Sequence, residues 1–111
     1  MIVVSTESNP MHNWRAEGTE FAVQEFSVNG DGNVSFRIET PDGNPAIVEA
    51  TALKVIDGTI PPSWVLKHSP EFQSYDLGPR RWQEPGFWEL WMDKDPAARA
   101  CYQEFRSTLD D

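Results

Sequence analysis

The ten residues Trp82-Gln-Glu-Pro-Gly-Phe-Trp-Glu-Leu-Trp91 hold three of the five tryptophans of this 111-residue chain. A buried aromatic side chain of this size removes about 150–250 Å² from water, so three of them would supply a large share of a small core. Trp88 and Trp91 are three residues apart and would share one side of a helical turn. Acidic residues are interleaved with these aromatics, which is also typical of a recognition surface. The sequence leaves open whether Trp82, Trp88 or Trp91 is exposed.

Directly after this run, the sequence predicts a C-terminal helix. Asp95 is a favourable N-cap residue and Pro96 a favourable first helical residue. Apolar residues then recur at helical spacing, namely Ala98, Cys101, Tyr102, Phe105 and Leu109. This pattern predicts a helix over about residues 96–109 with one apolar face, and Cys101 is interpreted as a small buried hydrophobic residue on that face.

Upstream of the tryptophan run, residues 20–40 predict a β-hairpin. The segment Asn29-Gly-Asp-Gly-Asn33 is dense in turn-forming residues. The residues that follow alternate, with Val34, Phe36 and Ile38 facing inward and polar residues between them. Such a pattern indicates two antiparallel strands that bury one face.

Residues 46–57 allow two interpretations. Asn44, Pro45 and Gly58 could cap a helix at its two ends. The many β-branched residues in the segment favour an extended chain instead, and we expect a long strand. Together, these elements predict one α+β domain over residues 1–111: a single antiparallel β-sheet of about 4–6 strands, with the C-terminal helix packed on one face.

Charge limits the possible partners. Eighteen acidic residues against nine lysines and arginines give a formal net charge of −9. This field repels nucleic-acid phosphates and anionic membranes and attracts basic partners, so neither nucleic acid nor membrane is expected as a partner. No apolar run approaches the roughly 20 residues that span a bilayer. The single cysteine fits a reducing compartment, and we expect a cytoplasmic protein.

No catalytic motif is evident in the sequence. His12 and His68 are the only histidines, and neither has a second histidine at metal-binding spacing, so a metal site would need Asp or Glu brought near by folding. Phosphate-binding glycine loops, nucleophile elbows and paired cysteines are absent from the sequence. We therefore predict no catalytic residue, no metal and no cofactor, and favour a non-catalytic protein over an enzyme.

The first functional hypothesis is a small acidic binding protein that recognises a basic protein partner, in the manner of an immunity or inhibitor protein. Its expected contact surface comprises Glu84, Trp88, Glu89 and Asp93, because acids steer the encounter and an exposed aromatic can anchor it. In size, acidity and aromatic content, the chain resembles the bacterial immunity proteins that neutralise basic toxins. This likeness is one of composition and carries no motif that can be matched residue by residue.

Two alternatives belong to other classes of protein. One is an enzyme or sensor for a small ligand, with a pocket between the sheet and the C-terminal helix lined by His68, Trp82 and Tyr102, and also by Trp88. The other is an accessory subunit that assembles through an exposed sheet edge.

Overall fold

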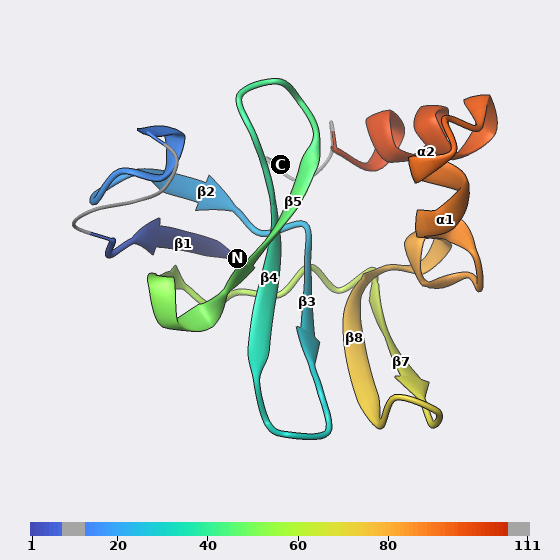
Figure 1. Ribbon diagram of the computed structural model, residues 1–111, viewed down its shortest axis with the longest axis horizontal. Coiled ribbons are helices and arrows are strands. Elements are labelled where there is room, and N and C mark those ends of the chain that lie inside the picture. The colour runs from blue at the N-terminus through green and yellow to red at the C-terminus, as the bar shows by residue number, and fades with distance from the viewer. Residues whose placement is uncertain (8–12, 107–111) are drawn as a thin grey trace.

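The computed structural model describes residues 1–7 and 13–106, and it contains two antiparallel sheets followed by two C-terminal helices (Figure 1). The α+β class is confirmed, but the prediction of a single sheet is wrong. The physical reason is that residues 20–28 and 45–57 each form two strands with a break between them. The two strands of each segment then join different sheets.

The smaller sheet has three strands and the larger has five. The smaller sheet has the order β2 (Glu20–Ala22), β1 (Ile2–Ser5), β6 (Leu53–Asp57). The larger sheet has the order β5 (Pro45–Glu49), β4 (Val34–Glu39), β3 (Glu25–Val28), β8 (Ser74–Pro79), β7 (Trp64–Ser69). A short 3₁₀ helix, η1 (Asn13–Arg15), lies between β1 and β2.

The predicted hairpin forms between β3 and β4, with Phe26 directly opposite Phe36. Its turn is stabilised by Asn29, whose side-chain oxygen accepts hydrogen bonds from the backbone N–H groups of Asp31 and Asn33, each at 3.0 Å. The hairpin begins at Glu25 rather than at residue 20, because Glu20–Ala22 pairs with β1 instead.

Residues 46–57 are extended, as the β-branched residues favour, but they do not form one long strand. The 3₁₀ helix η2 (Ala50–Ala52) divides the segment into β5 and β6. The break lets one stretch of chain serve as an edge strand in both sheets.

The C-terminal part comprises the 3₁₀ helix η3 (Arg80–Gln83), α1 (Phe87–Met92) and α2 (Pro96–Arg106). Asp95 caps α2 as predicted, since its Oδ2 accepts a hydrogen bond from the N–H of Ala98 at 3.0 Å. The predicted helix is confirmed up to residue 106, and residues 107–109 lie outside the described residues. In the described part of the chain, no helix has the length and apolar character needed to cross a lipid bilayer.

The buried apolar residues form two clusters. The first draws on both sheets and comprises Val3, Val23, Phe36, Ile38, Val48 and Trp64. The second, here called the aromatic cluster, comprises Trp82, Phe87, Ala98, Cys101 and Tyr102, with Trp88 and Trp91 partly buried against it. The aromatic cluster joins α2 to α1 and η3, so α2 packs on these elements rather than on one face of a sheet, where the sequence predicts it. A hydrogen bond of 2.8 Å from Gln24 Nε2 to the Tyr102 hydroxyl ties the cluster to the sheet region.

Candidate binding site

One face of the five-stranded sheet carries a row of polar residues that crosses all five strands. The paired residues of this row, from β5 to β7, are Glu49, Ser35, Ser27, Asp76 and Lys67. Because directly paired residues point to the same side of a sheet, the row lies opposite the face that bears Phe26, Phe36 and Val48. Ser27 donates a hydrogen bond from its hydroxyl to Oδ1 of Asp76.

Next to this row, Glu25 and Arg37 form an ion pair across β3 and β4. Arg37 Nε lies 3.3 Å from Glu25 Oε1, and Gln83 Nε2 donates a hydrogen bond of 2.6 Å to Glu25 Oε2. The Arg37 guanidinium carbon lies 3.7 Å from the centre of the Trp88 ring, which is a cation–π contact. The pair therefore links the sheet to η3 through Gln83 and to α1 through Trp88.

Glu25 is only 4% exposed, and this burial raises the pKa of its carboxyl group above the ordinary value. The positive charge of Arg37 and the hydrogen bond from Gln83 lower the pKa, and the nearby charge of Asp76 raises it, but burial is the largest effect. The folded protein thus holds this carboxyl in an environment that disfavours its charge.

Gly78 permits the close approach between β8 and η3. A Cβ atom at this position would lie 2.9 Å from Gln83 Nε2 and 3.0 Å from Glu25 Cγ. Any larger residue would push against the hydrogen bond between Gln83 and Glu25. A glycine here is required by the contact rather than by the backbone angles.

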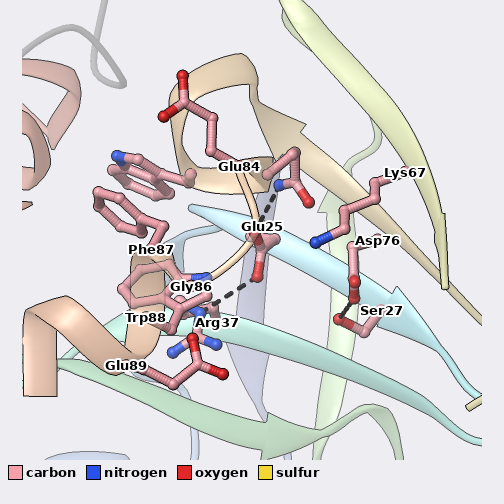
Figure 2. A pocket seen from close by; sticks show the side chains of 12 residues that line it. Glu25, Ser27, Arg37, Lys67, Asp76, Glu84, Gly86, Phe87, Trp88 and Glu89 are labelled. Atoms are coloured by element: carbon pink, nitrogen blue, oxygen red, sulfur yellow. Dashed lines mark hydrogen bonds and ion pairs between the residues drawn. The ribbon is translucent and has the colours of Figure 1, made fainter.

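A pocket of about 180 Å³ opens over these residues, between the sheet and the segment 82–89 (Figure 2). The sheet contributes Glu25, Ser27, Arg37, Lys67 and Asp76, and the segment contributes Trp82, Gln83, Glu84, Gly86, Phe87, Trp88 and Glu89. We call it the charged pocket, because four acidic and two basic side chains line it. Figure 2 shows Glu84 and Glu89 on opposite sides of it, and both residues are exposed.

The structure brings together three of the four residues of the predicted contact surface. Glu84, Trp88 and Glu89 all line the charged pocket. Asp93 does not line it, because it is the exposed C-terminal cap of α1. None of the three tryptophans of the run is exposed, since Trp82 is buried and Trp88 and Trp91 are partly buried.

The four residues of the alternative pocket lie in two places, since Trp88 packs in the aromatic cluster with Trp82 and Tyr102 and His68 does not. Trp82 and Tyr102 stack with their ring centres 5.3 Å apart inside the aromatic cluster. His68 instead stacks on Tyr75 at 4.6 Å, on the β7–β8 hairpin. Trp82 and Trp88 line the charged pocket, and His68 and Tyr102 do not; this pocket lies between the sheet and the η3–α1 segment rather than beside α2.

Sequence reasoning missed the floor of the pocket, which consists of Glu25, Arg37, Lys67 and Asp76. The alternation of the hairpin already placed Arg37 on the outward face. The pairing of β3 with β8 joins residues 49 positions apart, as in the Ser27–Asp76 hydrogen bond, and no local pattern reveals such a pairing.

In comparisons with known proteins, no family model, no curated protein and no solved structure matched this chain. Within residues 1–7 and 13–106, no three His, Cys, Asp or Glu side chains are arranged to hold a metal ion. The function is therefore inferred from the side chains of the site itself.

Proposed function

We propose that this protein is a non-catalytic binding protein for a basic protein partner, and that the charged pocket is the centre of its contact surface. The observation that carries this proposal is the placement of two exposed carboxylates, Glu84 and Glu89, at the sides of a pocket with two more acidic than basic residues. A lysine or arginine side chain of the partner that enters the pocket would offset one of these two surplus negative charges.

The size of the pocket supports a single side chain as its occupant. Its volume of about 180 Å³ is below the roughly 300–1,000 Å³ of pockets that hold drug-sized ligands. The overall charge of −9 supports the same partner class, because it accelerates the approach of a basic protein over a neutral one.

The floor of the pocket supports a binding role over a catalytic one. A buried carboxyl with a raised pKa is a common general acid or base. Both oxygens of Glu25, however, already contact donors, one on Arg37 and one on Gln83. These contacts suit a residue that fixes the position of η3 and α1, the elements next to Glu84 and Glu89, relative to the sheet.

The test is affinity capture from a native lysate with a charge-reversed variant and a matched control. Glu84→Lys/Glu89→Lys reverses the two exposed acids among the four that line the pocket. Asp31→Lys/Glu71→Lys reverses two exposed acids of hairpin turns that do not line the pocket. Each double change replaces two negative charges by two positive ones, so both variants go from −9 to −5.

We expect the unchanged protein and the control variant to retain the same basic proteins, and the pocket variant to lose them. If both variants lose them equally, the retention depends on net charge alone and the proposed contact surface is wrong. If neither variant loses them, the pocket acids play no part in binding.

A further inference from the structure

A second pocket, of about 130 Å³, lies between α2 and the segment that contains η3 and α1. Six of its nine lining residues are apolar and three are charged, and we call it the apolar pocket; the residues are Arg81, Glu84, Pro85, Phe87, Leu90, Asp95, Ala97, Ala98 and Cys101. Phe87, Ala98 and Cys101 are buried, while Leu90 is 49% exposed. An apolar side chain placed here would cover the exposed part of Leu90.

The two pockets are neighbours, because Glu84 and Phe87 line both of them. These two residues therefore form the ridge between a charged cavity and an apolar one. A partner that contacts the ridge can place one side chain on each side of it. In protein interfaces, a few side chains that fill well-packed, desolvated pockets carry most of the binding energy, and arginine is frequent among them.

We propose that the two pockets form one docking surface with two anchor points, which binds a segment of a basic protein that carries a lysine or arginine next to an aliphatic side chain. The basic side chain enters the charged pocket, and the aliphatic side chain enters the apolar pocket. This inference rests on the proposed function and adds to it the chemistry of the segment that is recognised.

The acidic residues around both pockets favour a basic partner on this surface. Glu84 and Glu89 flank the charged pocket, and Glu84 and Asp95 outnumber Arg81 around the apolar one. An acidic segment would be repelled at both anchor points. A second copy of the chain is disfavoured for the same reason, since each copy carries a charge of −9.

Cys101 contributes to the apolar character of the second pocket. It is 4% exposed, and burial raises the pKa of its thiol while the charge of Arg81 lowers it by a smaller amount. The thiol is therefore neutral at physiological pH and serves as a small apolar group. This environment suits an aliphatic side chain rather than an electrophile.

The probes for the test are four short peptides with blocked ends, added to the isotope-labelled full-length protein and followed by NMR of the backbone amides. The first peptide contains adjacent arginine and leucine. In the second, serine replaces leucine; in the third, citrulline replaces arginine; in the fourth, both are replaced. Citrulline keeps the shape of arginine without its charge.

We expect the first peptide to shift amides that line both pockets. It should bind at least about tenfold more tightly than the second, because burial of one aliphatic side chain is worth more than a factor of ten in affinity. Ala97→Phe fills the apolar pocket from an exposed position, and Ala100→Phe is the matched control on an exposed residue of α2 that does not line it. Ala97→Phe should reduce the affinity for the first peptide to that for the second, and Ala100→Phe should leave it unchanged.

The outcomes separate this inference from the proposed function. If both arginine peptides bind equally and Glu89→Gln weakens both, the two-anchor surface is wrong and the charged pocket stands. If the citrulline–leucine peptide binds as tightly as the first, the apolar pocket acts alone and both proposals are overturned. Shifts of the same amides with rising protein concentration would identify a second copy as the occupant and overturn the inference. The absence of shifts with every peptide would overturn both.

Discussion

Replacement of Trp82 by alanine should remove a large part of the stability of this protein. Trp82 is 1% exposed and lies at the middle of the aromatic cluster, with its ring centre 5.3 Å from that of Tyr102 and 5.5 Å from that of Trp88. Truncation of a buried aromatic residue to alanine costs about 3–5 kcal/mol. Trp82 contacts several rings, and each such pair adds about 0.5–1.5 kcal/mol. We therefore expect Trp82→Ala to lower the free energy of unfolding by about 4–5 kcal/mol. This is a large fraction of the roughly 5–15 kcal/mol that is the usual free energy of unfolding of a native protein.

The assay is urea unfolding followed by far-ultraviolet circular dichroism, combined with hydrogen exchange of the native protein. Since the two apolar clusters are distinct, Trp82→Ala should reduce the protection of amides in α1 and α2 more than in β3 and β4. Phe36→Ala, in the first cluster, should do the reverse. Met92→Ala, at a residue that is 73% exposed, should change the free energy of unfolding by less than about 0.5 kcal/mol.

Two results would refute this reasoning. A loss of less than about 1 kcal/mol for Trp82→Ala would show that the aromatic cluster is not a packed core. An equal loss of protection in the helices and in the five-stranded sheet would show that the two clusters unfold as one unit.

Three further substitutions test the contacts around the two pockets. Burial raises the pKa of Glu25, so its favourable contribution to folding is complete below its ordinary pKa and is lost as the pH rises through the raised one. Relative to the unchanged protein, Glu25→Gln should therefore gain stability as the pH rises above about 4, and urea midpoints that show no such relative gain would contradict the assignment. Gly78→Ala should destabilise the protein because the new Cβ would lie 2.9 Å from Gln83 Nε2, and a thermal melt with an unchanged midpoint would show that η3 yields without cost. Asp95→Ala removes the cap on the Ala98 N–H and should cost about 1 kcal/mol in urea unfolding, whereas Asp95→Asn, which keeps a capping oxygen, should cost less.

The local elements of this fold are readable in the sequence, since their signals involve neighbouring residues. The side chain of Asn29 accepts hydrogen bonds from backbone N–H groups of the hairpin turn, and the side chain of Asp95 accepts one from the backbone at the start of α2. The division into two sheets could not be predicted from such signals. The β-branched residues of 46–57 indicate extended backbone, but they do not mark the turn at Ala50–Ala52 that sends β5 and β6 to different sheets.

The candidate site was predicted on one side only. Glu84, Trp88 and Glu89 are close in sequence, and one segment carries them to the same pocket. The floor of the pocket forms only when β3 pairs with β8 in the register that places Ser27 beside Asp76. The role of Glu25 depends on the same long-range pairing, because its burial and its contact with Gln83 arise only when η3 folds over the sheet.

The most direct test of the central claim is a hydrogen-exchange footprint of the protein with a basic partner obtained by capture. If the charged pocket is the contact surface, the partner should slow exchange of the amides in residues 84–90, and Glu84→Lys/Glu89→Lys should abolish this protection. Protection confined to β5 (Pro45–Glu49), an edge strand of the five-stranded sheet, with residues 84–90 unchanged, would contradict the account and favour assembly through a sheet edge.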